Sequence, residues 1–419
     1  MITLIEALNF RCLRYIKQPL GPLHVLVGPN ASGKTTFLDV IAFLGQVVSE
    51  GLDTAIAERS ANFQDLVWGR AGAGFELAVE AAIPQPIRGK IAANGYDTVR
   101  YETAFELDAE STEVHIVAEK VLLKRSVPPG PLQRTLFPDS VTPPRSILTG
   151  KAGPGEKTII NKVRGGNDLF YSEVYSAAGK GWVPAFKLGP RKSALGNMPA
   201  DETKFPATTW FRGLLTQGVQ QLVLNSLVIR KASSPGQVRG FKPDGSNLPW
   251  VIADFQRRSE ERFQDWLAHL RTALPDLEGV RTVEREDDKH RYLVLKYRGD
   301  LEVPSWMASD GTLRLFALTL PAYLPDLSGV FLIEEPENGI HPRAVEAMFQ
   351  SLSSVYGAQV LLATHAPVIL GIVDAEKVLC FAKTTAGETD IVSGSDHPAL
   401  REWKGETNLA ALFAGGVLG

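Results

Sequence analysis

The feature that most constrains this chain is a phosphate-binding loop close to its first residue. Residues 28–35 are Gly-Pro-Asn-Ala-Ser-Gly-Lys-Thr, which fits the pattern of Gly, four residues, Gly, Lys and then Ser or Thr. The glycines let successive backbone N–H groups turn toward phosphate, and a following helix adds the positive end of its dipole. An apolar run, Leu23 to Val27, precedes the loop, and a helical run from Gly33 to about Val48 follows it. The sequence therefore predicts a strand, loop and helix that bind a nucleotide.

Each position of the loop has an expected role in binding ATP with Mg²⁺. Lys34 reaches the β and γ phosphates, and the Thr35 hydroxyl is a ligand of the metal ion. The loop residues expected to contact the nucleotide are Gly28, Asn30, Ser32, Gly33, Lys34, Thr35 and Thr36.

Two further apolar runs end in residues that suit the same site. Gly329 to Ile333 leads into Glu334, which is expected to hold Mg²⁺, and then Glu335, which is expected to act as general base on the attacking water. The alternative is a solvated acidic turn. Leu361 to Ala363 leads through Thr364 into His365, which is expected to contact the γ-phosphate.

A short polar segment offers a third contact with phosphate. Ser309-Asp310-Gly311-Thr312 comes just before an expected helix, Leu313 to Leu320. The hydroxyl of Ser309 and the amides around Gly311 can bind a γ-phosphate at a helix N-terminus. The alternative is an ordinary N-cap, because Ser and Asp are common there.

The order of these motifs resembles the ABC-type AAA-family ATPase heads of the RecF, SMC and OLD group. Residues 8–13, Leu-Asn-Phe-Arg-Cys-Leu, are similar to the group's opening motif, and residues 244–248 also resemble it. Residues 334–342, Glu-Glu-Pro-Glu-Asn-Gly-Ile-His-Pro, and residues 364–367, Thr-His-Ala-Pro, are similar to its later motifs. The resemblance implies an α/β fold: a mixed sheet around the phosphate loop, an antiparallel β meander, a helical subdomain and a basic insertion.

The resemblance also implies a homodimer or a higher even oligomer in which two heads enclose two ATP molecules. Ser309 would then act in trans on the nucleotide held by Lys34, and Arg11 would lie near the nucleotide. Asn338 and Gly339 would form the loop that crosses the dimer, and Gln64 is a candidate for the glutamine loop. OLD proteins carry a nuclease domain after the ATPase. Here 54 residues follow His365 and contain no Asp-x-Asp pair, so a nuclease is expected on a separate polypeptide.

Patterning divides the chain into four expected segments. They are an N-terminal ATPase lobe at 1–124, a basic Pro- and Gly-rich β insertion at 125–205, a helical subdomain at 206–290 and a C-terminal ATPase lobe at 291–419. Alternating residues predict strands Thr3 to Leu8, Phe75 to Ile83, Thr98 to Leu107, Glu113 to Leu123, Thr158 to Val163, Asp168 to Val174 and Arg291 to Tyr297. Helices are expected from Pro206 to Leu227 and, as one amphipathic helix, from Pro249 to Ala273.

Charge is distributed unevenly. Residues 120–192 hold thirteen Lys or Arg and four Asp or Glu, in a chain with a formal net charge of -3. We expect these cations to stay exposed and to contact nucleic acid. The alternatives are a solvated insertion and an acidic protein partner.

No run reads as a signal peptide or a membrane span, and Cys12 and Cys380 are the only cysteines. A cytoplasmic protein without a membrane partner is therefore expected. The leading functional hypothesis is an ATPase subunit that controls a nucleic-acid process, either phage defence with a nuclease-like effector or DNA repair. The alternatives are a transporter ATPase and a nucleotide-gated scaffold with little turnover.

Overall fold

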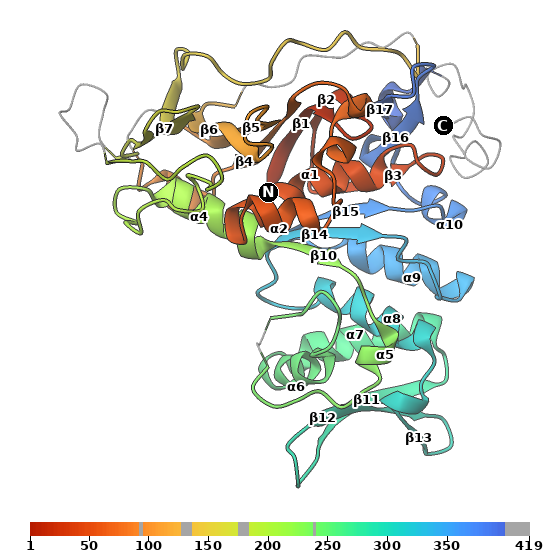
Figure 1. Cartoon of the computed structure of the whole chain (residues 1–419). Helices are drawn as coiled ribbons and strands as arrows, with labels where there is room; N and C mark the ends of the chain where they lie inside the picture. The colour runs from red at the N-terminus through yellow and green to blue at the C-terminus, as the bar shows by residue number, and fades with distance from the viewer. Residues whose placement is uncertain (92–94, 127–135, 175–183, 238–239, 399–419) are drawn as a thin grey trace.

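Three sheets organise the computed structural model, which describes residues 1–91, 95–126, 136–174, 184–237 and 240–398 (Figure 1). The largest sheet is antiparallel throughout and has the strand order β2-β1-β4-β5-β6-β7-β8-β9. Its strands are β1 (Ile2–Phe10), β2 (Leu13–Pro19), β4 (Gly74–Ala82), β5 (Thr98–Leu107), β6 (Val114–Lys124), β7 (Glu156–Val163), β8 (Asp168–Phe170) and β9 (Ala185–Phe186). The predicted meander is confirmed, and the expected basic insertion continues it.

The second sheet is mainly parallel and has the order β10-β14-β15-β3-β16-β17. Only β17 runs antiparallel to its neighbour. The strands are β3 (Leu23–Val27), β10 (Val219–Leu222), β14 (Gly329–Glu334), β15 (Ala358–Ala363), β16 (Val378–Lys383) and β17 (Thr389–Ser393). β3 and β15 are buried along their whole length, as expected of parallel strands covered on both faces. The predicted strands before the phosphate loop and before the two later motifs are confirmed as β3, β14 and β15.

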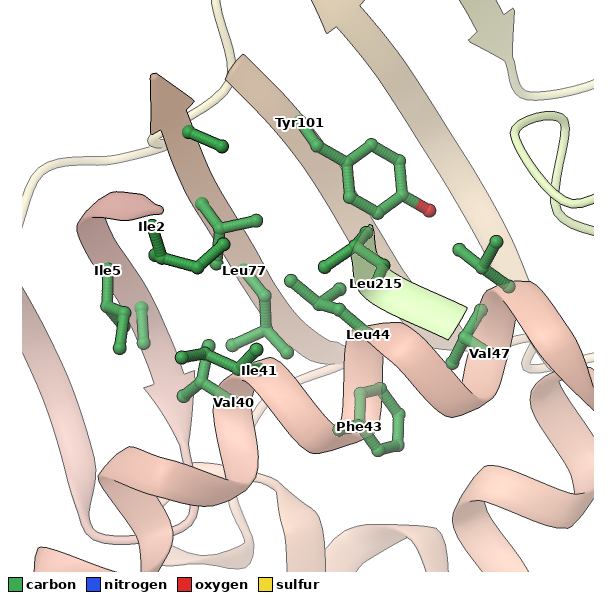
Figure 2. Close-up of a cluster of buried hydrophobic side chains, with 14 of the residues drawn as sticks. Ile2, Ile5, Val40, Ile41, Phe43, Leu44, Val47, Leu77, Tyr101 and Leu215 are labelled. Carbon is green, nitrogen blue, oxygen red and sulfur yellow. The ribbon is translucent and has the colours of Figure 1, made fainter. Parts of the chain in front are cut away.

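Helix α1 (Lys34–Ser49) lies between these two sheets and belongs to their shared core. Its apolar residues recur along the helix, and Figure 2 shows Val40, Ile41 and Leu44 facing Ile5 and Leu77 of the antiparallel sheet. The phosphate loop is thereby fixed at the junction of the two sheets. Short helices α2 (Leu52–Ala57), α3 (Gln85–Arg88) and α4 (Pro206–Gly213) complete this part of the molecule.

A second lobe lies below the parallel sheet in Figure 1, and its apolar core continues onto one face of that sheet. It contains α5 (Ser226–Ile229), α6 (Leu248–Arg258), α7 (Glu260–Ala273) and α8 (Asp310–Thr319), with α9 (Pro342–Ser353) against it. A three-stranded sheet of β11 (Leu277–Glu284), β12 (Arg291–Tyr297) and β13 (Leu301–Pro304) joins the lobe, and α10 (Pro367–Leu370) follows β15. The segment boundaries expected from the sequence stay predictions.

The helix expected from Pro206 to Leu227 is wrong beyond its first two turns. After α4, a π-helical turn at Leu214–Gly218 leads into strand β10, which pairs in parallel with β14. The two backbones come so close that a Cβ on Gly329 would lie 2.2 Å from the Gly218 carbonyl oxygen. Pairing with the neighbouring strand overrides the local helical pattern here.

The single amphipathic helix expected from Pro249 to Ala273 is also wrong. It is two helices, α6 and α7, separated at Ser259, whose φ of -151° is not helical. The break lets the chain fold back, so that the rings of Phe255 and Phe263 lie 5.8 Å apart. In one straight helix their backbones would be roughly 12 Å apart. Burial of both aromatic rings therefore favours the break.

Candidate nucleotide site

The phosphate loop has a backbone that only small residues allow. It contains three residues with positive φ, namely Gly28 at 144°, Ala31 at 61° and Gly33 at 106°. A Cβ on Gly28 would lie 2.2 Å from the Phe381 carbonyl oxygen, and one on Gly33 would lie 2.3 Å from Thr389 Oγ1. The two glycines are therefore required by close packing against β16 and β17, and the curved backbone leaves an open concave side.

Lys34 is buried at the start of α1 and turns back over this loop. Its Nζ donates to the carbonyl oxygens of Gly28 at 2.7 Å and Pro29 at 2.9 Å. Burial lowers the pKa of the Lys34 ammonium group, and the nearby Glu335 and Glu334 carboxylates oppose that shift. The Lys34 ammonium group is thus held at the loop by neutral carbonyl oxygens. The oxygens of a bound phosphate would give it an anionic partner.

Thr35 and Glu334 place two oxygen ligands together at one end of the loop. The Thr35 hydroxyl donates to Glu334 Oε2, although the two residues are 299 positions apart. Hydroxyl and carboxylate oxygens suit Mg²⁺, which commonly takes few protein ligands and completes its shell with water and substrate phosphate. In the ranges that the structure describes, no cluster of three or more His, Cys, Asp or Glu forms a dedicated metal site. The residues present therefore fit a magnesium ion that arrives with a nucleotide.

Glu335 directly follows Glu334 and has strained backbone geometry. Its φ is 46°, and its N–H donates to the Ala363 carbonyl at 2.8 Å, which fixes the turn after β14 to the end of β15. The Asn338 amide donates to Glu335 Oε2 at 2.5 Å. A non-glycine residue in the left-handed region is costly, and such strain is concentrated at functional sites.

Glu337 has a different position from Glu335. Its Oε1 accepts from the Thr364 hydroxyl at 2.7 Å and from the His365 backbone N–H at 2.9 Å. It therefore holds the turn that presents the His365 side chain. Burial lowers the pKa of His365 and the Lys34 cation lowers it further, against the opposing carboxylates of Glu335 and Glu337.

Lys34, Thr35, Glu334, Glu335 and His365 line one cavity of about 410 Å³. This is the carboxyl edge of the parallel sheet, where ligands bind in sheets of this kind. The structure brings together Lys34 and Glu334, which are 300 positions apart in sequence. The lining residues are Arg11, Cys12, Asn30, Ala31, Ser32, Gly33, Lys34, Thr35, Thr36, Glu334, Glu335, Ala363, His365 and Lys383.

Ser309 and Gly311 are not among the lining residues of this cavity. Ser309 is the N-cap of α8, and its hydroxyl oxygen accepts from the Thr312 N–H at 3.1 Å. A Cβ on Gly311 would lie 2.4 Å from the Gly339 carbonyl oxygen, so the N-terminus of α8 packs against the loop that contains Asn338 and Gly339. Within one chain, the segment around Ser309 is therefore separate from the cavity.

Sequence reasoning missed three residues near the nucleotide site. Cys12 and Lys383 line the cavity, and Gln221 lies beside Glu334, with Nε2 3.5 Å from Glu334 Oε1. Gln221 projects from β10, which the sequence assigned to a helix, so its signal was hidden by that error. Gln64 lies in a short helical turn, Phe63–Leu66, and does not line the cavity.

The basic segment 120–192 only partly has the exposed cations that its composition suggested. Lys151, Lys187 and Lys192 are exposed, as expected. Lys162 is buried, and its Nζ donates to Asp168 Oδ1 and to the Gly189 carbonyl oxygen, both at 2.8 Å. Arg164 is paired with Glu106 of β5. The expected exposure of Lys162 is therefore wrong, because its charge is used to hold strands β7 and β8 together.

None of the helices in the described ranges combines the length and apolarity of a bilayer span.

Comparison with known proteins agrees with this geometry. Residues 23–371 match the family described as "AAA domain, putative AbiEii toxin, Type IV TA system". A stretch of 41 residues is 54% identical to the OLD nuclease of Thermus scotoductus, and covers 10% of this chain and 8% of that protein.

One solved structure of an SMC head shares the fold at low sequence identity. An SMC head bound to the C-winged helix domain of ScpA matches with a TM-score of 0.52 and 13% identity, over 94% of this chain and 97% of that chain. The SMC head domain of Thermotoga maritima matches with a TM-score of 0.44 and 11% identity, over 94% of this chain and 98% of that chain. Since the family match spans most of the chain and includes the phosphate loop, Glu334, Glu335 and His365, the chain belongs to the family "AAA domain, putative AbiEii toxin, Type IV TA system".

Proposed function

We propose that this chain binds ATP with Mg²⁺ and hydrolyses the bond to the γ-phosphate. One observation carries the proposal. A single cavity is lined by the phosphate-binding Lys34, by Thr35 in contact with Glu334, and by Glu335 and His365. These are the groups that phosphoryl transfer to water requires, namely phosphate binding, metal binding and a base.

The chemistry divides among the side chains as follows. Backbone amides of the loop and the Lys34 ammonium group bind the β and γ phosphates. Thr35 and Glu334 would hold the metal ion, which would supply positive charge next to those phosphates. Glu335 accepts a proton from the water that attacks phosphorus in line with the leaving ADP oxygen. The His365 imidazole contacts the γ-phosphate and so distinguishes ATP from ADP.

We propose further that two chains, or a higher even number, close over two nucleotides. Ser309 caps α8 away from the cavity of its own chain, so it is available to a nucleotide bound by a second chain. The contact of Gly311 with the Gly339 loop links this segment to the turn that begins at Glu335. Closure of the dimer and positioning of the base are thereby coupled.

Glu335→Gln tests this function most directly. The amide cannot accept the proton, so steady-state hydrolysis of ATP should slow by about 10²–10⁴-fold while ATP binding persists. The lost negative charge also favours an ATP-bound dimer, which size-exclusion chromatography with light scattering would detect. Glu346→Gln, on the exposed face of α9, is the matched control and should leave turnover unchanged. Turnover of Glu335→Gln within a few-fold of the unmodified protein would contradict the assignment and point to Glu337.

A second candidate, a nucleotide-gated scaffold with little turnover, is favoured by the Asn338 amide on Glu335 Oε2. In that case hydrolysis by the unmodified protein is slow, and Asn338→Ala should accelerate it in the same assay. As to the process served, we propose control of a nucleic-acid reaction, in phage defence through a separate nuclease-like effector or in DNA repair. The short likeness to an OLD nuclease supports it. The nucleic-acid contact of residues 120–192 stays a prediction.

A further inference from the structure

Arg11 reaches the rim of the nucleotide cavity from the turn between β1 and β2. The turn has left-handed geometry at Asn9, with φ 60°, and at Arg11, with φ 51°, and the Arg11 N–H donates to the Leu66 carbonyl at 2.9 Å. The backbone is thus fixed, but the side chain is 38% exposed. Among the described residues, its guanidinium makes one ion pair, from NH1 to Asp39 Oδ2 at 3.2 Å.

Asp39 has a stronger partner in Arg59. Arg59 Nε lies 2.8 Å from Asp39 Oδ1 and 2.9 Å from Oδ2, and Arg59 NH2 lies 2.6 Å from Oδ1. Arg59 NH1 also donates to Gln46 Oε1 at 2.8 Å and to the Ala55 carbonyl at 2.7 Å. Its guanidinium lies 5.0 Å from the centre of the Phe43 ring. Arg59 is therefore fixed on several sides and is only 11% exposed.

Two guanidinium groups consequently share one carboxylate. Arg59 makes the shorter and more buried contacts with Asp39, whereas Arg11 makes the longest and most exposed one. If Arg11 left, Asp39 would keep a bidentate partner and would not become an unpaired buried charge, which is the costly outcome. Arg11 is thus the cation of this cluster that can be released most easily, and it lies at the cavity that phosphate would enter.

We propose that Asp39 and Arg59 form a holder that keeps Arg11 at the rim until nucleotide phosphate draws its guanidinium away. Asp39 competes with phosphate for Arg11, and Arg59 weakens that competition by neutralising Asp39. Asp39 and Arg59 are positioning residues, since they act on the nucleotide through Arg11. The inference rests on the proposed nucleotide site and adds a means of setting its affinity.

If Asp39 and Arg59 form this holder, substitutions of the two residues should change nucleotide affinity in opposite directions. Asp39→Asn removes the competing charge and should tighten nucleotide binding by about threefold, the scale expected for a partly exposed ion pair. Arg59→Met removes the neutralising charge but keeps an apolar side chain on Phe43, so Asp39 should retain Arg11 and binding should weaken by about threefold. Both effects should disappear when Arg11 is replaced by alanine, because coupled residues are non-additive.

The experiment is a calorimetric titration of each full-length variant with AMP-PNP and Mg²⁺, accompanied by a thermal melt to establish folding. Asp53→Asn is the matched control, because Asp53 on α2 also pairs with an arginine, Arg191, but does not line the cavity. It should leave the affinity unchanged.

If the cluster had a merely structural role, both Asp39→Asn and Arg59→Met would bind nucleotide more weakly, and that result overturns the holder. An effect of the same size in the Arg11→Ala background would overturn it as well. Should Arg59→Met fail to fold, the cycle of Asp39→Asn with Arg11→Ala decides alone. Unchanged affinity of Asp39→Asn, with binding by the unmodified protein intact, overturns the holder only. No binding by the unmodified protein overturns the proposed function, and this inference with it.

Discussion

Two buried lysines in this molecule have opposite relationships to negative charge. Lys162, in the basic segment, is 4% exposed and has a permanent partner in Asp168, at 2.8 Å. Lys34, in the phosphate loop, is 8% exposed and donates only to neutral carbonyl oxygens, at 2.7 and 2.9 Å. Burial lowers the pKa of the Lys34 ammonium group, although the nearby Glu335 and Glu334 carboxylates oppose that shift.

The difference teaches how to separate a binding cation from a structural one. Breaking a buried ion pair is costly because it leaves one charge unpaired, so its lysine is not readily released to a ligand. A buried lysine held by carbonyl oxygens at a curved glycine loop still needs an anion, and a triphosphate is one. The number of cations in a segment does not tell which of them can bind a ligand, because Lys34 and Lys162 are counted in the same way.

The largest expected effect separates these two lysines directly. Lys34→Ala should abolish measurable ATP binding, because the phosphates lose the cation of the loop. Without nucleotide it should cost little stability, since no carboxylate loses a hydrogen-bonded partner. Lys162→Met should leave ATP affinity unchanged but destabilise the fold by roughly 3–5 kcal/mol, because Asp168 is left charged and buried.

Calorimetric titration with ATP and a thermal melt of each variant measure both properties. The comparison breaks if Lys34→Ala binds ATP with unmodified affinity. It also breaks if Lys162→Met melts at the temperature of the unmodified protein.

The second prediction tests whether another chain encloses the ATP triphosphate bound by Lys34. Ser309→Arg should block turnover without blocking ATP binding, because the bulky cation would prevent closure while Lys34 and Thr35 still hold the nucleotide. Mixing this variant with Lys34→Ala should restore part of the hydrolysis, because the mixed dimer has one site with an intact loop and an intact Ser309. A mixture of two folded chains that stays inactive would contradict action in trans, or show that both sites must fire together.

The smallest expected effect concerns the exposed cations of the basic segment. Reversing Lys151, Lys157 and Arg164 to glutamate, with Lys162 left intact, should weaken duplex DNA binding by only a few-fold. Arg164 already has Glu106 and Lys157 donates to the Glu173 carbonyl at 3.2 Å, whereas Lys151 is exposed.

The slope of log affinity against log salt should therefore change by less than about 0.9, the value for one neutralised phosphate. Filter binding across a salt series would measure it. A loss of affinity above about tenfold, with a slope change of two phosphates or more, would show that these side chains leave their partners for DNA.

The nucleotide site was predictable because its parts are local. A glycine loop after an apolar strand, and carboxylates or a histidine at the ends of two other apolar strands, are visible in short windows. Parallel strands present their carboxyl ends at one edge, so Lys34, Glu334 and His365 were expected to meet, and the structure places them in one cavity. The meander was predictable for the same reason, since alternation of side chains is a property of each strand alone.

The sequence by itself thus determined the phosphate loop, the general fold and the residues that meet at the sheet edge. Only the tertiary structure decided that residues 219–222 form a strand beside β14, which places Gln221 near Glu334. It also decided that Lys162 is paired with Asp168 and that Arg59, not Arg11, is the main partner of Asp39. The physical reason for this difference is that the periodicity of a helix or strand depends on residues close together in the sequence. The partner of a charge, and the pairing of a short strand, depend on which distant segment is packed beside it.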